Sequence, residues 1–282
     1  MALVMAAALT GCGMSPPATT PGVTAPTVTA PTVTAPRGTA TPTTDLAPVL
    51  VYFPRDSSRG IRLGREERRV PAHDRLRGAL IAMLDGPVDP DYIGGWPAGT
   101  QLLGVSTAAQ VTTVDLSEEA RVTSVGSEAA ALAVAQLVWT VTEIQGADTE
   151  VMLTIAGVPA DELWGVLTWD EPRARGAAVD DRVLVSIDAP LDGAAVTSPV
   201  TILGDAAVFE ATLPWRISDL AGTVVAEGWA TTAVGQEFSE YSVEVVLAPG
   251  EYVIEVAEAD VSGGEGRAAD TDTRRITVVR YS

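Results

Sequence analysis

Hydrophobic positions between residues 47 and 176 change their period several times, which predicts a small domain of mixed strands and helices. The run 49–53 is apolar throughout and ends at Pro54, as a buried strand does. A helix is predicted next, because five apolar residues recur at helical spacing: Leu76, Ala79, Leu80, Met83 and Leu84. Gly86 and Pro87 end it, since glycine tolerates a left-handed backbone and proline cannot continue a helix.

The rest of this region alternates between strand and helix patterns. A second helix is expected from about 127 to 144, where apolar residues again share one face. Further strands are predicted near 66–70, 101–106, 111–116 and 150–155. The order strand, helix, strands, helix, strand predicts a small α/β layer.

Residues 181–282 are rich in short strand patterns and poor in helix patterns, which predicts an all-β sandwich. Seven strands are expected, at 183–188, 200–207, 211–218, 224–229, 238–247, 252–258 and 275–279. Turn residues such as Pro249 and Gly250 separate them. We expect Trp215 to pack in the core between the two sheets.

The N-terminus carries the pattern of an export signal. Residues 1–9 are almost entirely apolar, although no Lys or Arg precedes them, and Leu9-Thr10-Gly11-Cys12 follows. This tetrapeptide resembles the lipobox of bacterial lipoproteins, in which the cysteine thiol is linked to a lipid. The resemblance implies a signal peptide at 1–11, a lipid anchor (diacylglycerol, with a palmitate-type acyl chain) on Cys12, and a location on the outer face of the cytoplasmic membrane.

Residues 12–46 are predicted to form a tether between the lipid and the folded part. Three short repeats rich in Thr, Val, Ala and Pro lie between Val23 and Pro36. Regular prolines block helix formation and sheet pairing, and few large apolar groups offset the entropy of ordering such a chain.

Composition excludes several classes of function. The formal net charge is -19, so a nucleic-acid partner is not expected, because phosphate binding requires clustered basic residues. The chain has one cysteine, Cys12, and one histidine, His73, so neither an internal disulfide nor a Cys/His zinc site can form within it. We predict no cofactor and no bound metal.

Several short segments of residues 47–176 together resemble the sporulation and spore germination (GerMN) domain: 84–87 (LDGP), 97–103 (PAGTQLL), 114–117 (VDLS) and 135–142 (AQLVWTVT). The resemblance implies an envelope-associated, non-catalytic α/β module. Segments of 181–282 resemble the immunoglobulin-like domain of bacterial spore germination: 187–190 (IDAP), 198–204 (SPVTILG), 209–217 (FEATLPWRI), 219–223 (DLAGT) and 248–252 (APGEY). The second domain often follows the first in one chain, so each resemblance supports the other.

Candidate catalytic or metal-binding residues are few. His73 beside Asp74 has the elements of a general base, but it precedes a helix at its solvated start. Two oxygen-rich loops, 89–91 and 260–272, are weak calcium candidates without the spacing of an EF-hand. We therefore predict no catalytic residue.

Charge is distributed unevenly along the chain. Eight arginines and four acids lie between Arg55 and Arg77, a local charge of 8 − 4 = +4. From Asp181 onward there are 17 acids and 6 arginines, a charge of 6 − 17 = −11. A basic hairpin of this kind is suited to an anionic surface or an acidic partner, and Arg65, Arg68 and Arg69 are the candidate partner-binding residues.

These observations favour a lipid-anchored binding or scaffold protein over an enzyme. Its expected partners are the membrane, through the anchor, and either envelope proteins or peptidoglycan, in envelope biogenesis or in a process similar to sporulation or germination. Two alternatives remain: a carboxylate-based hydrolase of cell-wall glycan, which needs two facing carboxylates in a cleft, and a solute-binding lipoprotein, which needs a deep apolar pocket.

Overall fold

The computed structural model describes residues 45–122, 126–260 and 265–280. The predicted signal peptide, Cys12 and nearly all of the predicted tether lie outside the described residues. Residues Thr43–Ser282 form one unit by their contacts, so the two folded regions predicted from sequence can be described together. In the described part of the chain, no helix combines the length and the apolar character needed to cross a bilayer.

The described residues begin with an antiparallel hairpin of β1 (Leu46–Arg55) and β2 (Arg62–Pro71), in register from Leu46↔Pro71 to Arg55↔Arg62. Alternation along β1 places Val49, Val51 and Phe53 in the core of the first domain. The opposite face of the hairpin carries Arg65, which points toward the second domain. Both faces of the hairpin mix apolar and charged residues and both are covered: Glu66 lies on the face of Val51, whereas Tyr52 and Leu63 lie on the face of Arg65.

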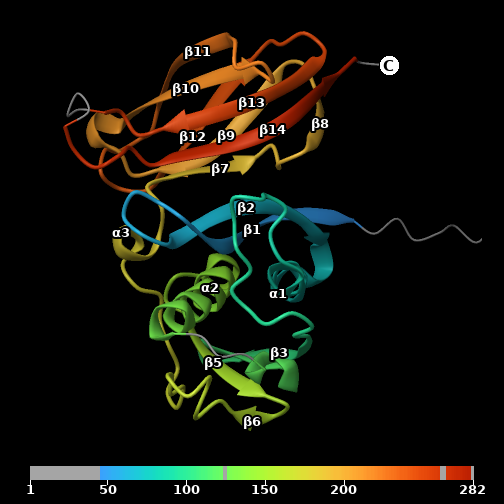
Figure 1. The fold of residues 1–282 in the computed structure, drawn as a ribbon. Coiled ribbons are helices and arrows are strands. Elements are labelled where there is room, and N and C mark those ends of the chain that lie inside the picture. The colour runs from blue at the N-terminus through green and yellow to red at the C-terminus, as the bar shows by residue number, and fades with distance from the viewer. Residues whose placement is uncertain (1–44, 123–125, 261–264, 281–282) are drawn as a thin grey trace, which may run out of the picture. The chain divides into compact units, whose positions relative to one another are not determined.

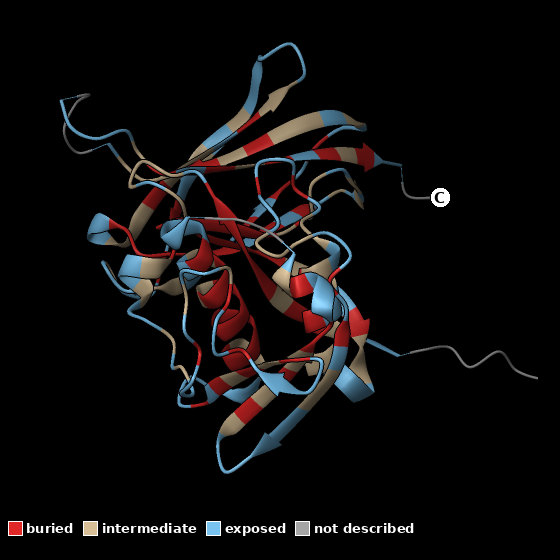
Figure 2. Ribbon diagram, turned by 60° about the horizontal axis from the view of Figure 1, so that its bottom comes forward, coloured by how far each residue is buried: buried red, intermediate tan, exposed pale blue. Residues whose placement is uncertain are grey.

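Two helices pack beneath the hairpin. They are α1 (Arg75–Asp85) and α2 (Ser127–Gln145), and they lie between the hairpin and a second sheet (Figure 1). The predicted face of α1 is confirmed, since Ala79, Leu80 and Met83 are buried. Most of α2 is buried as well (Figure 2), because it contacts the hairpin, α1 and the sheet.

The second sheet has the order β3-β4-β5-β6 and completes the first domain. Its strands are β3 (Leu102–Ala108), β4 (Val111–Leu116), β5 (Glu150–Ile155) and β6 (Val158–Pro159). Strands β3 and β4 form a hairpin, whereas β4 and β5 are parallel. A parallel pair needs a long crossover connection, and α2 supplies it.

The second domain is a β-sandwich, as the predicted fold class requires. Its smaller sheet, of order β12-β9-β7, contains β7 (Val185–Ala189), β9 (Val200–Ala206) and β12 (Ser239–Val245). Its larger sheet, of order β11-β10-β13-β14-β8, contains β8 (Ala194–Thr197), β10 (Thr212–Asp219), β11 (Val224–Thr231), β13 (Gly250–Ala257) and β14 (Thr271–Val279). Inward-facing residues of both sheets form one core, including Ile202, Leu213, Ile217 and Ile254.

The structure differs from the predicted sandwich in three places. Strand β8 was not predicted, because it is short and pairs in parallel with the end of β14. Strand β14 begins at Thr271, four residues before the predicted start. The prediction missed this part of the strand because two of its inward positions, Asp272 and Arg274, are charged. Trp215 is only partly buried at the margin of the core, where its ring lies against Gly228 on the neighbouring strand.

Short elements fill the connections. Three are 3-10 turns, η1 (Ala72–Asp74), η2 (Glu118–Arg121) and η3 (Phe209–Ala211), and one is a single helical turn, α3 (Ala178–Asp181). The turn α3 precedes β7, so the chain enters the sandwich beside the hairpin; there the Val183 N–H donates to the Leu63 carbonyl at 3.0 Å.

Candidate functional site

Residues with catalytic potential do not gather in one place. His73 lies exposed in η1, beside the exposed Asp74. Among residues 45–122, 126–260 and 265–280, no cluster of His, Cys, Asp and Glu has the arrangement needed to hold a metal ion. The most concentrated chemistry in the described residues is a network of buried charges between the hairpin and the sandwich.

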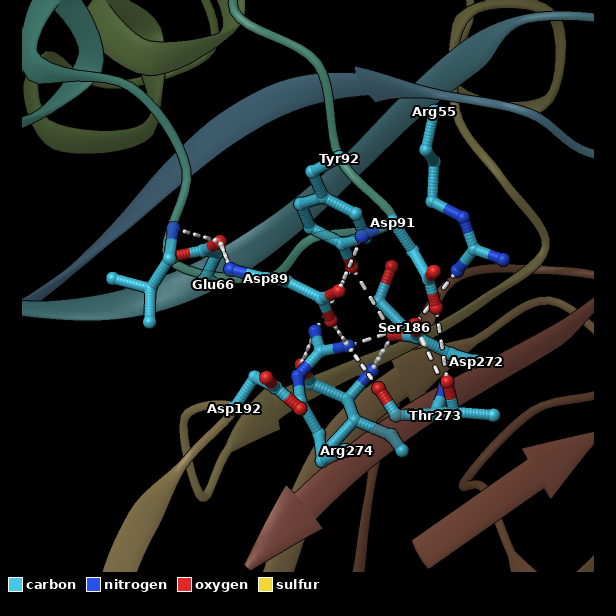
Figure 3. A network of polar contacts seen from close by, with 12 residues as sticks. Arg55, Glu66, Asp89, Asp91, Tyr92, Ser186, Asp192, Asp272, Thr273 and Arg274 are labelled. Carbon is cyan, nitrogen blue, oxygen red and sulfur yellow. Dashed lines mark hydrogen bonds and ion pairs between the residues drawn. The ribbon is translucent and has the colours of Figure 1, made fainter. Parts of the chain in front are cut away.

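The first centre of this network is Arg274 on β14 (Figure 3). Its side chain is fully buried, and Nη1 binds the carboxylates of Asp89 and Asp272. Its Nη2 donates to the Tyr92 hydroxyl at 2.9 Å and to the Ile187 carbonyl. Asp89 and Tyr92 belong to the first domain, so one guanidinium joins both domains.

Asp272 connects this centre to the tip of the hairpin. Its Oδ1 lies 2.8 Å from Arg55 Nη1, and Oδ2 accepts the Ile187 N–H at 2.7 Å and the Tyr92 hydroxyl at 3.1 Å. The carboxylate is 1% exposed, and two cations with two neutral donors satisfy it. A buried charge is tolerated in a protein when ion pairs and hydrogen bonds of this kind offset its loss of hydration.

The second centre lies along the hairpin, at Arg65. Its Nε and Nη2 donate to the two oxygens of Asp188 at 2.8 and 2.7 Å, a bidentate pair, and Nη1 lies 3.2 Å from Asp205. Arg182 Nη2 donates to Asp205 at 2.7 Å. Two cations and two anions therefore alternate, so that each charge meets its opposite.

Aromatic rings surround the Arg182 guanidinium. The ring centroids of Tyr52 and Trp139, from the first domain, lie 5.4 and 5.7 Å away, and that of Phe238 lies 4.1 Å away. Trp139 also donates from Nε1 to Asp181 at 2.8 Å. Cation–π contacts of this kind gain strength where water is excluded.

The loop that presents Asp89 is held by a buried carboxylate on β2. Glu66 is 0% exposed and accepts the backbone N–H groups of Val88 and Asp89 at 3.0 and 3.1 Å. Arg68 donates to Glu66 at 2.8 Å and to the Gly86 carbonyl at 2.6 Å. The charged sequence of β2 therefore fixes the loop that reaches the sandwich.

These positions correct the predicted roles of the hairpin arginines. Arg65 is 6% exposed and paired within the chain, and Arg68 is used to hold the 86–89 loop, so neither is offered to an outside partner. Arg69 is open to solvent, with a side chain 63% exposed and 3.6 Å from Glu67. The acidic surface that suits the hairpin belongs to the sandwich of the same chain.

The acids of the loop 89–91, a weak calcium candidate, have partners within the chain. Asp89 is paired with Arg274, and Asp91 accepts the Thr273 hydroxyl at 3.0 Å. In the second candidate loop, residues 261–264 lie outside the described residues, whereas Asp270 accepts the Ser58 N–H at 2.9 Å and the Ser58 hydroxyl at 2.6 Å. Arginine and backbone donors thus occupy oxygens that a cation would need.

Burial and pairing shift the ionisation of these groups in opposite directions. Burial raises the pKa of Asp188 to about 7 against the opposing effect of Arg65, and raises that of Asp89 to about 6 against Arg274. Burial also acts on Asp270, but hydrogen bonds from Ser58 and from the Leu184 N–H outweigh it and lower the pKa. For Arg274, burial disfavours the cation, yet its acidic partners hold the pKa well above the ordinary value.

We expect the free energy of unfolding to fall as the pH rises from about 5 to about 8. At pH 5 the folded state retains protons on Asp188 and Asp89, whose pKa values are raised to about 7 and about 6, whereas unfolded aspartates have a pKa of about 3.9. Raising the pH removes protons from the folded state alone, so stability declines. Urea unfolding at several pH values measures this slope.

Asp188→Asn is expected to flatten that slope, because the group with the larger shift can no longer titrate. The matched control is Asp148→Asn, at an exposed position outside the network. Stability that stays constant or rises between pH 5 and pH 8 in the unmodified chain would contradict the assignment.

A hollow of about 300 Å³ opens where the hairpin, α2 and the smaller sheet meet. Four acids contribute to its lining: Glu67, Glu143, Asp188 and Glu240. Asp188 binds Arg65, Glu143 accepts the Tyr52 hydroxyl at 2.8 Å, and Glu67 pairs with Arg69. Three of the four acids in this lining are therefore engaged by side chains of the same chain.

Two family models match the chain in the order that the sequence predicted. Residues 50–161 match the family described as "Sporulation and spore germination". Residues 184–265 match the family described as "Immunoglobulin-like domain of bacterial spore germination". Both resemblances are confirmed, and neither description names a catalytic activity.

The solved structures that this chain matches are distant in sequence. The tandem GerMN domains of the sporulation protein GerM from Bacillus subtilis are 16% identical, over 50% of this chain and 50% of that one, with a TM-score of 0.38. The first GerMN domain of that protein is 20% identical, over 45% and 97%, with a TM-score of 0.36. A putative lipoprotein from Clostridium perfringens is 18% identical, over 48% and 91%, with a TM-score of 0.32.

The chain therefore spans half of the length of the tandem-domain structure that it matches. Among curated proteins, none matches this chain.

Proposed function

We propose that this chain, which matches a sporulation and spore germination domain followed by an immunoglobulin-like domain of bacterial spore germination, is an envelope scaffold. In this proposal a lipid on Cys12 holds the protein at the outer face of the cytoplasmic membrane. The two folded domains then bind envelope proteins or peptidoglycan beyond the tether.

One observation carries the scaffold role: a buried charge network joins the two domains within one compact unit. Arg65 belongs to the first domain and binds Asp188 of the sandwich. Arg274 belongs to the sandwich and binds Asp89 of the first domain as well as Asp272 of its own strand. A module whose two domains have a fixed orientation can hold two partners at a set distance and angle. An extended, flexible connection would not do this, because linked domains move unless their interface is large and well packed.

The non-enzymatic part of the proposal rests on how the charged groups are used. The buried carboxylates of the network are engaged by arginines, hydroxyls and backbone N–H groups. General acid–base catalysis needs a carboxyl group that reaches substrate. The buried carboxylates of the network instead bind groups of the same chain, across the contact between the two domains.

We expect tagged full-length protein to enter the membrane fraction, to take up a lipid label, and to bring down a small set of envelope proteins from solubilised membranes. The matched control is Cys12→Ser, which should lose both the label and the membrane fraction, because it lacks the thiol that carries the lipid. Fractionation, a clickable fatty-acid label and mass spectrometry of captured proteins are the measurements.

Each contrary result points to a different error. Equal membrane association of Cys12→Ser would remove the lipid anchor from the proposal. Recovery of the protein alone, after in-cell crosslinking, would remove the scaffold role. Release of soluble sugar from purified peptidoglycan would replace it with the hydrolase alternative.

A further inference from the structure

The outer face of the larger sheet carries two short rows of side chains with different chemistry. Register places Trp229 on β11 opposite Pro214 on β10, and Arg216 opposite both Glu227 and Glu255. Trp215 pairs with Val256, so Ala257 follows on the same face as Pro214. One row is therefore apolar and the next is charged.

These rows border a hollow of about 560 Å³. Its lining includes the apolar row (Pro214, Trp229 and Ala257) and the charged row (Arg216, Glu227 and Glu255). Pro214 and Ala257 have short side chains that rise little above the sheet, whereas the ring of Trp229 beside them is large. The result is a shallow surface depression with one aromatic wall.

Trp229 is unusual among the tryptophans of the chain because it is 67% exposed. Within the described residues its ring stacks on no other ring, no arginine lies over it, and its Nε1 has no acceptor. Indole usually buries its large apolar face and finds a hydrogen-bond partner for its N–H. In this depression both the ring face and the N–H are open to solvent, so both are accessible to a ligand.

The polar row is arranged to give and to accept hydrogen bonds. Arg216 Nη2 lies 2.9 Å from Glu255, and this pair is held at the surface rather than in the core, with side chains 55% and 29% exposed. Guanidinium groups donate in a planar fork, whereas carboxylates only accept. Glu227 adds a second acceptor on the other side of Arg216.

A saccharide combines what these two rows require. A pyranose ring has an apolar face of C–H groups, which packs on a flat aromatic ring, and hydroxyls at its rim that both donate and accept. Anionic polymers are disfavoured, because residues from Asp181 onward carry 17 acids and 6 arginines. A neutral sugar chain avoids that repulsion.

We infer that the Trp229 hollow on the larger sheet binds a neutral oligosaccharide, with the indole under one sugar ring and Arg216, Glu227 and Glu255 at its hydroxyls. The inference rests on the proposed function only for the source of the sugar, which in the envelope is the glycan backbone of peptidoglycan. Binding itself requires neither the lipid anchor nor a protein partner.

The test is isothermal titration calorimetry of the full chain in detergent with two probes, a tetramer of β-1,4-linked N-acetylglucosamine and a tetramer of β-1,4-linked glucose. Trp229→Ala should weaken binding by about 30-fold or more, as truncation of an aromatic residue at the centre of a binding site does. Phe209→Ala is the matched control, since Phe209 is a second exposed aromatic, 51% exposed, outside this hollow. The affinity of Phe209→Ala for both tetramers should equal that of the unmodified chain.

Preference for the N-acetylated tetramer would identify peptidoglycan-type glycan as the source, and equal affinity would identify neutral β-1,4 glycans in general. No heat with either probe would overturn the inference, as would equal binding by Trp229→Ala. Self-association that Trp229→Ala abolishes, without sugar binding, would assign the face to a second copy of the chain instead. Loss of sugar binding would leave membrane capture through Cys12 unaffected, so the two proposals fail separately.

Discussion

Replacing Arg274 with alanine is expected to lower the free energy of unfolding by about 3–5 kcal/mol, the cost typical of breaking a buried ion pair. The side chain is 0% exposed, and its removal leaves Asp89 and Asp272 without the cation that lies between them. Arg55 still reaches Asp272, but Asp89 has no second arginine among the described ion pairs. Urea unfolding at pH 7 measures the loss.

The neighbouring residue provides the control. Arg275 is exposed on the other face of β14, so Arg275→Ala should change stability by no more than about 0.5 kcal/mol. Adding Asp89→Asn to Arg274→Ala should recover part of the loss, because it removes one of the unpaired charges. Equal stability of the two single alanine variants would show that the network does not hold the domains.

Much of the fold could be predicted from sequence because its elements have one apolar side. The spacing of Leu80 and Met83 predicted α1, and alternation over residues 150–155 predicted β5. The helix 127–144 was predicted to within one residue of its observed end at Gln145. In each case the residues that define the pattern are those that enter the core.

The site could not be predicted in the same way, because it consists of buried charges whose partners are distant in sequence. Arg65 and Asp188 are 123 residues apart, and Arg274 and Asp89 are 185 apart. A hydropathy pattern assigns such residues to the surface. For that reason β14 was predicted to begin only at Arg275, although Arg274 faces inward in line with Ile276.

One signal of the site was present in the sequence, namely the contrast between a basic hairpin and an acidic sandwich. Opposite charge on two parts of one chain has two explanations, an outside partner for each part or a contact between them. The structure shows the second for Arg65, whose partners are Asp188 and Asp205. The hairpin is therefore a docking element within the protein.

Reversing the charge of Arg65 should consequently open the two domains rather than weaken capture of a partner. In Arg65→Glu, three carboxylates would meet in a site where the native side chains are 5–11% exposed, and the unpaired charges should cost about 5 kcal/mol or more. Urea unfolding measures the loss. Trypsin reports the opening, because the chain has arginine but no lysine, and Arg182 is 4% exposed while the domains are docked.

Arg69→Glu makes the same change of charge four residues along the same strand, at a side chain 63% exposed, and should cost no more than about 0.5 kcal/mol. Cleavage after Arg182 should be fast in Arg65→Glu and slow in Arg69→Glu, at protease concentrations that leave the unmodified chain intact. Adding Asp188→Asn to Arg65→Glu should slow that cleavage again, since it removes one of the three repelling charges. If both reversals unfold and cleave alike, Arg65 is not part of a docking contact, and the fixed orientation on which the scaffold role depends is lost with it.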